Sequence, residues 1–536
     1  MSVRSPRYLL RWMMSLACWV SCVNAVATAA DDVANAGWES TETAVEPSTE
    51  DATSINVSDT GAHSLGGGSA YQQSPRGSLP GGPGVRNTSA SNASTQQSAG
   101  QQSSLQSSAA NSMSIPANPA AVNIIVGSGA FGDAVGFNRN GLRFGGVTVN
   151  NGSGILSGGL APGKWAGQQL TIGDLSFDTD KGGLWEGGTF GTQYLYHAGY
   201  GAPTVVNGIA QHPGSPNSLA GSALGFNSLD NRSPTDRSEL YQLWYRHEFF
   251  DKKLVVRVGK SVPTYDFANV VKPKPTLGGA GDIPGVSGAI LTPLYVNPTM
   301  LGLIPGYYNS AAGVVAALAP VDDFYMQYGF FDGSLALQKQ TGLQGPHFNG
   351  HYFHIGEVGV SWTLTEDDLP GRFGVGYWGQ TGYIPTFNGP VNGAQGVYFF
   401  GSQCLYWENP GKSNQGLNGF YQFGATDSPF VITQRFFGCG LTYFGLLPHR
   451  DDDSFGFAMA WGRQNSDPNI GRAFYTGYGT GPAPLGVHEV ILTWYYQIKV
   501  SDNIFVQPNL TYIPDPARVP GTPGAFPFTL QATMLF

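Results

Sequence analysis

The chain has 536 residues, of which 76 are glycine, 36 are proline and 12% are aromatic. Only 12% are charged, about half the usual share, and 36 acidic residues outnumber 27 basic ones. This composition excludes a coiled coil or helical bundle and argues against a nucleic-acid partner. It is typical of a β-structure with long loops.

The N-terminus has the features of an export signal. Three arginines precede an apolar stretch over Trp12–Val20, and the small residues Ala25, Ala27 and Ala29 follow at cleavable spacing. The apolar run is short for a membrane span. We therefore predict a signal peptide over residues 1–29 rather than a membrane anchor.

Residues 30–118 form a low-complexity segment of the sequence. From residue 61 onward it consists mainly of Ser, Gln, Asn, Ala, Gly and Pro, with Arg76 and Arg86 as its only charged side chains and Tyr71 as its only aromatic one. Such a composition cannot bury enough apolar surface to offset the entropy of ordering. We predict a disordered spacer, and we keep contact with the cell wall or a role as a channel plug open as alternatives.

From about Leu142 onward, apolar and polar residues alternate with period two. In the final segment the positions on one face are Phe526, Phe528, Leu530, Ala532, Met534 and Phe536, and similar alternation runs through 488–499 and 504–512. Successive side chains of a strand point to opposite faces, so the pattern predicts strands with one apolar and one mostly polar face. No uninterrupted apolar stretch of 18 residues follows the signal, which argues against helical spans.

This pattern predicts sixteen strands. Their expected centres are Gly145, Ile172, Gln193, Trp244, Val256, Val315, Gln327, Val358, Val375, Phe399, Phe420, Gly438, Phe457, Leu492, Val506 and Leu530. Short connections such as 251–252 and 501–502 alternate with mostly longer ones, of which 198–237, 265–309 and 464–485 are the longest.

The sorting of short and long connections is typical of an outer-membrane barrel, with short periplasmic turns and long external loops. The predicted fold class is therefore all-β: a transmembrane antiparallel β-barrel over residues 119–536, preceded by the disordered spacer. A secreted β-sandwich or propeller is the alternative. We find neither a propeller repeat nor a second linker in the sequence.

A barrel of about sixteen strands encloses a water-filled lumen, which predicts passive passage of small solutes. Alternation assigns both charge signs, amides and aromatic rings to the inner face. This suits sugars, which need hydrogen-bond partners and apolar platforms. The predicted channel-lining residues are Gln242, Trp244, Arg246, Glu248, Arg257, Glu357, Trp378, Glu489, Tyr495, Gln497, Gln507 and Asn509.

The long proline-containing connection 265–309 has the length of a functional loop. We expect part of it to fold into the lumen and narrow it. A lid that lies wholly outside the barrel is the alternative.

Three stretches resemble the carbohydrate-selective porins of the OprB family. They are 239–267, 445–453 and 507–513, and the resemblance extends over about residues 140–536. It implies a sixteen-stranded outer-membrane channel for sugars, with charged residues at a narrowed eyelet. Small carbohydrates and outer-membrane lipid are then the expected partners, with no nucleic acid, and a homotrimer stays open. The long N-terminal spacer departs from the family pattern.

Other chemical motifs are weak. Residues 127–132 match the glycine pattern of dinucleotide sites, but a glycine-rich stretch follows in place of a helix. His351 and His354 would point to opposite faces of a strand, so a zinc site with His347 is not expected. We predict neither a cofactor nor an enzyme. An adhesin or a barrel enzyme with a blocked lumen is the alternative function.

Overall fold

The computed structural model describes residues 127–206, 209–230, 236–268, 297–300, 309–321, 323–337, 346–364, 369–384, 389–409, 415–468 and 484–536; of residues 203–206 and 209–213 it describes the backbone alone. The predicted signal peptide and spacer lie outside the described residues. Within them, no helix has the length and apolar character needed to cross a membrane.

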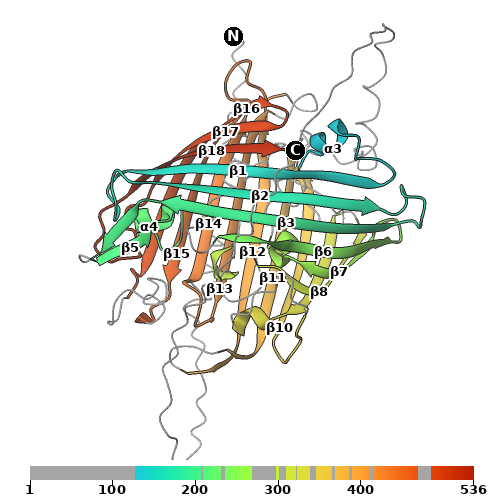
Figure 1. Ribbon diagram of the computed structural model, residues 1–536, viewed down its shortest axis with the longest axis horizontal. Helices are drawn as coiled ribbons and strands as arrows, with labels where there is room; N and C mark the ends of the chain where they lie inside the picture. Colours follow the sequence, from blue (N-terminus) through green and yellow to red (C-terminus); the bar gives the residue numbers. More distant parts are fainter. Residues whose placement is uncertain are drawn as a thin grey trace, which may run out of the picture. The chain divides into compact units, whose positions relative to one another are not determined.

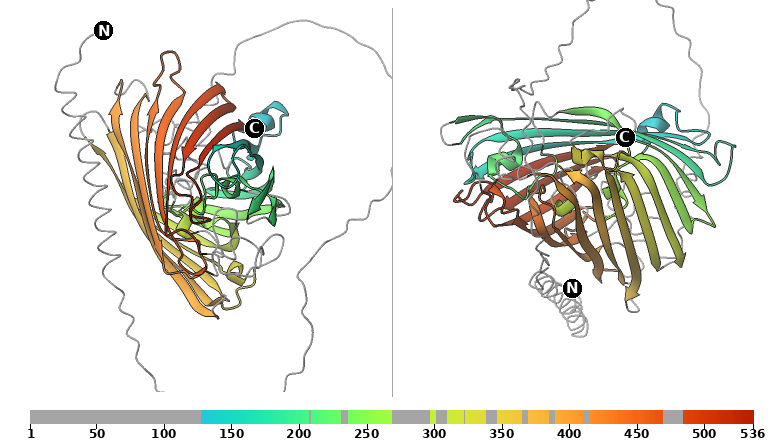
Figure 2. Two further views of the ribbon diagram at one scale, coloured as in Figure 1. Left: turned by 90° about the vertical axis from the view of Figure 1, so that its left-hand side faces the viewer. Right: turned by 90° about the horizontal axis from the view of Figure 1, so that it is seen from below.

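In the described part of the chain, sixteen strands close into one antiparallel barrel (Figures 1 and 2). The strands are β1 (Leu142–Ser157), β2 (Trp165–Asp178), β3 (Gly188–Gly201), β6 (Arg237–Phe249), β7 (Leu254–Ser261), β8 (Ala311–Val321), β9 (Phe324–Asp332), β10 (Tyr352–Leu364), β11 (Leu369–Ile384), β12 (Val391–Trp407), β13 (Gly416–Thr426), β14 (Thr433–Phe444), β15 (Ser454–Gln464), β16 (His488–Ser501), β17 (Ile504–Tyr512) and β18 (Phe526–Leu535).

Each strand pairs with its neighbours in the barrel, and β1 closes it by pairing with both β2 and β18. The C-terminal residue takes part in the closure, because the Phe536 backbone N–H donates to the Gly146 carbonyl at 2.8 Å. The predicted all-β fold is confirmed, and each of the sixteen expected centres lies inside one barrel strand.

The connection between β3 and β6 contains structure that alternation did not predict. It holds a separate two-stranded sheet of β4 (Pro203–Val206) and β5 (Ile209–Pro213), followed by the short helix α4 (Pro216–Ala220). Every described side chain of α4 is buried. The α4 part of this connection is therefore packed against other parts of the protein.

Among the residues that the structure describes, four further short helical segments lie outside the strands. They are α3 (Ala130–Ala134) before β1, and the 3₁₀ segments η1 (Pro263–Tyr265), η4 (Pro298–Met300) and η5 (Ser334–Leu337). Both η1 and η4 belong to the long connection between β7 and β8, and both are fully buried.

The two faces of the wall differ as the alternation predicted. On β18, Leu530 and Met534 are 47% and 46% exposed, whereas the intervening Gln531 and Thr533 are 4% and 3% exposed. The outer face must be apolar in hydrocarbon, while a closed sheet satisfies its own backbone hydrogen bonds. The same alternation runs along β16, where His488 is exposed and Glu489 is buried.

Glycine in the strands lets rings pack flat on the inner wall. A Cβ placed on Gly376 would collide with the ring of Tyr398 on the neighbouring strand, and one on Gly456 would collide with Tyr495. These collisions give a physical reason for part of the high glycine content.

Candidate functional site

The inner face of the barrel wall is the candidate functional site. All twelve predicted channel-lining residues lie on barrel strands, and in each case they alternate with the residues of the exposed outer face. They form three groups, on β6–β7, on β10–β11 and on β16–β17.

Charged side chains cluster on β6 and β7. Arg246 Nη1 lies 2.7 Å from Glu248 Oε1, and these side chains are 14% and 18% exposed. The Arg257 guanidinium forms an ion pair with Asp266 and lies 5.8 Å from the centre of the Trp244 ring. Both signs of charge and an aromatic face are therefore close together on this part of the wall.

A chain of hydrogen-bonded side chains runs along the inner wall from β6 to β2. Gln242, which is 2% exposed, donates through Nε2 to Gln193 Oε1 at 2.5 Å, and Gln193 in turn donates to Asp174 Oδ2 at 2.9 Å. Gln193 and Asp174 were not predicted as site residues. Their inward positions follow from alternation, which could have identified them.

The chain after β7 lies against the inner wall. Residues 261–268 are all buried, and the Phe267 side chain is fully so. Ala268 N–H donates to Glu357 Oε2 at 2.7 Å, and Gln327 Nε2 donates to the Asp266 carbonyl at 2.8 Å. The start of the long connection is therefore tied to β9 and β10.

The later part of the same connection contacts another part of the wall. Asn297 donates through Nδ2 to the Phe423 carbonyl on β13 at 3.1 Å, while its Oδ1 accepts from the hydroxyl of Thr299 at 2.8 Å. Thr299 is fully buried. The described segments 262–268 and 297–300 of this connection thus lie inside the barrel, as expected, and they contact strands that are not adjacent. Residues 269–296 and 301–308 are outside the described residues.

Glu357 is the centre of a buried cluster, which we call the Glu357 cluster. Besides Ala268 N–H, its carboxylate accepts from Tyr325 Oη at 2.8 Å, Gln327 Nε2 at 2.9 Å and Tyr398 Oη at 2.9 Å. Arg372, 6% exposed, lies on the adjoining strand with its guanidinium 5.0 Å from the centre of the Phe400 ring. Of this cluster only Glu357 was among the predicted site residues.

Trp378 lies on β11, next to the strand that carries Glu357, and its side chain is fully buried. Its ring centre is 6.0 Å from that of Phe353, which is also fully buried. The structure therefore gives Trp378 packing contacts with the neighbouring strand.

Like Glu357, Glu489 on β16 is a buried carboxylate on the inner face of the wall. Its carboxylate accepts from the Ser222 hydroxyl, from Ala223 N–H at 2.9 Å and Leu224 N–H at 3.1 Å, and from Ala517 N–H at 2.6 Å. These donors belong to two different external connections, those after α4 and after β17. Glu489 therefore ties two loops to the wall.

The remaining residues on β16 and β17 form neutral polar contacts. Gln497 Nε2 donates to Gln507 Oε1 at 2.9 Å, and Gln507 Nε2 donates to Asn509 Oδ1 at 2.6 Å. The hydroxyls of Tyr495 and Thr442 lie 2.6 Å apart. This part of the inner wall presents amides and hydroxyls.

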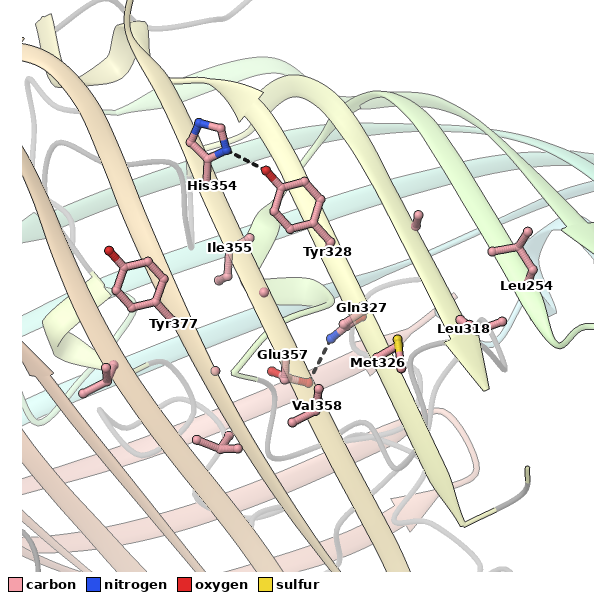
Figure 3. Close-up of a pocket in the computed structure, with 15 residues that line it drawn as sticks. Leu254, Leu318, Met326, Gln327, Tyr328, His354, Ile355, Glu357, Val358 and Tyr377 are labelled. Atoms are coloured by element: carbon pink, nitrogen blue, oxygen red, sulfur yellow. Dashed lines mark hydrogen bonds between the residues drawn. The ribbon is translucent and has the colours of Figure 1, made fainter. Parts of the chain in front are cut away.

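An apolar hollow of about 780 Å³ lies on the opposite, outer face of the wall (Figure 3). Met326, Tyr328, Val358 and Tyr377 line it, and these side chains are 41%, 49%, 42% and 50% exposed. These exposed side chains belong to the lipid-facing surface, while Gln327 and Glu357 of the inner wall also border the hollow.

His351 and His354 do not converge on a shared site. His354 Nδ1 lies 2.6 Å from the Tyr328 hydroxyl, and His351 Nε2 lies 3.1 Å from the Tyr383 carbonyl. In the described residues, no group of three or more His, Cys, Asp or Glu side chains is arranged to hold a metal ion.

Comparisons with known proteins agree with this geometry. The family model described as "Carbohydrate-selective porin, OprB family" matches residues 166–536. Porin B of Pseudomonas aeruginosa is 24% identical over 313 residues, an alignment that covers 52% of this chain and 64% of that relative. The chain thus spans less than two thirds of the length of Porin B.

A solved structure with a TM-score above 0.5 shows the same fold. The high pH structure of Pseudomonas putida OprB matches with a TM-score of 0.59 and 19% identity, covering 76% of this chain and 97% of that one. Its low pH structure matches with a TM-score of 0.47 and 16% identity, over 76% of this chain and 96% of that one.

Proposed function

Because this chain belongs to the OprB family of carbohydrate-selective porins, non-enzymatic channels of the bacterial outer membrane, we propose that it passes small neutral carbohydrates by passive diffusion through its lumen. The observation that carries the proposal is the closed sixteen-stranded wall with an apolar outer face and a polar inner face. A barrel of this size is wide enough to hold an aqueous channel.

The chemistry of the inner wall supports a neutral, polyhydroxylated solute. Arg246 and Glu248 supply donors and acceptors without an excess of one charge, and Trp244 supplies an apolar face. Amides on β16 and β17 can both donate and accept. Such a surface can exchange hydrogen bonds with a sugar that loses its hydration shell.

We propose that the twelve predicted residues shape the pathway in two ways. Partly exposed residues on β6 and β7, such as Arg246 and Glu248, would contact the solute. The fully buried carboxylates Glu357 and Glu489 would act by holding inner segments against the wall. The first set then governs selectivity and the second governs the width of the lumen.

Single-channel conductance in planar bilayers, titrated with mono- and disaccharides, tests the proposal. We expect an ion current that saturating sugar reduces, and we expect Arg246→Ala and Glu248→Ala to change both the conductance and the sugar affinity. Leu243→Ala is the matched control, because Leu243 lies on the same strand but is 55% exposed on the outer face. No current, a current insensitive to sugar, or equal effects from all three substitutions would contradict it.

We also propose that the barrel assembles with further copies of itself as a homotrimer. The outward positions of β1 and β2 include Thr148, Asn150, Gln169 and Thr171 in place of large apolar side chains, and Asn150 pairs with Gln169 across the two strands. Exposed amides in hydrocarbon are unfavourable, and amides on a second copy can satisfy them.

Native mass spectrometry of the detergent-solubilised barrel tests this assembly. We expect Asn150→Leu/Gln169→Leu to shift the population toward monomers. Leu530→Val on the adjoining strand β18 is a control that keeps the outer face apolar. A monomeric parent protein would overturn the proposal.

The proposed export signal has a separate test. We propose cleavage after residue 29, so N-terminal sequencing of the protein from outer membranes should begin at residue 30. A chain that keeps Met1 would contradict it.

A further inference from the structure

Three side chains able to carry positive charge form a row across neighbouring strands of the barrel. In the strand pairing, Arg435 on β14 lies opposite Arg463 on β15, and Arg463 lies opposite His488 on β16. Strands of a sheet are about 4.8 Å apart, so the three residues span about 10 Å. We call them the outer basic row.

The row lies on the outer face of the wall. Each member adjoins an inward-facing residue: Phe436 is fully buried, Glu489 is 1% exposed, and a Cβ on Gly462 would lie 2.9 Å from Leu224 in an inner connection. Because successive residues of a strand point to opposite faces, Arg435, Arg463 and His488 point away from the lumen.

The row also lies at the external end of the strands. It is close to the described residues 427–432, 465–468 and 484–487, which lie at the opposite end of the barrel from the short turns. The next outward positions toward the membrane are Phe437, Trp461 and Val490, and the rings of Trp461 and His488 stack with centres 5.5 Å apart. Aromatic residues of this kind mark the boundary between hydrocarbon and headgroups.

Outward-facing basic side chains are distributed unevenly along the wall. In the strands that the structure describes, the outward Arg and Lys residues are Lys260, Arg435 and Arg463, and each lies near an external strand end. The single carboxylate on β14, β15 and β16 is Glu489, which faces inward.

We propose that the outer basic row binds the phosphate group of a glycolipid headgroup in the outer leaflet of the membrane. A guanidinium presents paired N–H donors that match two phosphate oxygens, and it does so better than an ammonium group. Basic clusters beside the hydrocarbon region are a general means of binding anionic headgroups. The aromatic side chains beneath the row would contact the acyl chains of the same lipid.

Lipid retention by the full-length protein tests the proposal. The protein is purified from outer membranes in a mild detergent, and phosphorylated glycolipid is extracted and quantified per barrel by mass spectrometry. We expect Arg435→Gln/Arg463→Gln/His488→Gln to lower retention at least tenfold, and Arg463→Lys to lower it less. Lys181→Gln/Lys253→Gln, in the short turns at the opposite end, is the matched control and should retain the parent amount. Equal retention by the triple variant and the parent would overturn the proposal.

A direct titration separates the lipid from other anions. The delipidated barrel, whose folding is confirmed by heat-modifiable electrophoresis, is titrated with purified bisphosphorylated lipid A, with its dephosphorylated form and with inorganic phosphate. We expect tight binding of the phosphorylated lipid alone, lost in the triple variant. Equal binding of the dephosphorylated lipid would exclude phosphate recognition, and binding of inorganic phosphate with equal affinity would exclude a lipid headgroup as the specific ligand.

Discussion

Two buried carboxylates on different parts of the barrel wall bind inner segments in different ways. Glu357 on β10 accepts from three wall side chains and from one loop N–H, that of Ala268. Glu489 on β16 accepts from the Ser222 hydroxyl and from three backbone N–H groups, all of them in loops. Both are almost fully buried, at 4% and 1% exposure.

The comparison shows that one residue type at equivalent inward positions can have different structural roles. Around Glu357 the donors belong mainly to rigid strands, so the carboxylate has partners whether or not the loop is in place. Around Glu489 the donors arrive only when two external connections fold against the wall. We therefore expect Glu489 to matter more for stability and Glu357 more for the position of the segment after β7.

Replacement of Glu489 should have the largest effect. Glu489→Ala leaves the N–H groups of Ala223, Leu224 and Ala517 without their acceptor in a buried place, and each such group costs about 1–3 kcal/mol. We expect the free energy of unfolding to fall by about 3 kcal/mol or more. Urea unfolding in lipid vesicles measures it.

Two further variants sharpen this prediction. Glu489→Gln keeps one oxygen acceptor and should lose less stability, while Val490→Ala, at the next, outward position, should cost less than Glu489→Ala. Limited proteolysis should also cleave the 214–230 connection faster in Glu489→Ala. If Glu357→Ala destabilised the barrel more than Glu489→Ala, the distinction between the two carboxylates would be wrong.

Glu357→Ala should have the next largest effect on stability, together with a change in conductance. Tyr325, Gln327 and Tyr398 lose a shared acceptor, but all three donors are side chains that can turn toward other partners. We expect a loss of about 2–3 kcal/mol. Because Ala268 loses its anchor, single-channel recordings of Glu357→Ala should show larger current fluctuations than those of the parent. Recordings of Glu489→Ala should show smaller fluctuations than those of Glu357→Ala.

Alternation in the sequence predicted the strands and their faces but not these partners. Glu357 and Glu489 were both assigned inward because their neighbours Val358 and Val490 are apolar, and this depends only on local geometry. The donors at Ala268, Ser222 and Ala517 come from connections with no periodic pattern, so contacts between them and the wall depend on how the loops fold. Arg372, Tyr325 and Gln327 could have been identified, since they alternate with Phe373 and Met326.

Replacement of Tyr398 tests whether the wall donors at Glu357 contribute as charge-assisted hydrogen bonds. Tyr398→Phe removes a hydroxyl that donates to Glu357 Oε2 at 2.9 Å and keeps the ring over Gly376. Hydrogen bonds to charged groups contribute about 1.5–3 kcal/mol. We expect a loss of unfolding free energy in that range, and a double-mutant cycle with Glu357→Gln should give a clear coupling energy. Additive effects would show that the hydroxyl and the carboxylate act independently.

Tyr495→Phe provides the neutral counterpart and the smallest expected effect. Its hydroxyl lies 2.6 Å from that of Thr442, and both side chains are buried on the β14–β16 side of the wall. A hydrogen bond between uncharged groups contributes about 0.5–1.5 kcal/mol, so we expect a smaller loss than for Tyr398→Phe. Both substitutions remove one hydroxyl from a ring that covers a glycine, Gly376 or Gly456, so packing changes are matched. The difference between the two losses, measured by the same urea titration, therefore isolates the contribution of the carboxylate charge. If Tyr495→Phe were as costly as Tyr398→Phe, the buried charge of Glu357 would not strengthen its hydrogen bonds, and its proposed role in anchoring the segment after β7 would lose its electrostatic basis.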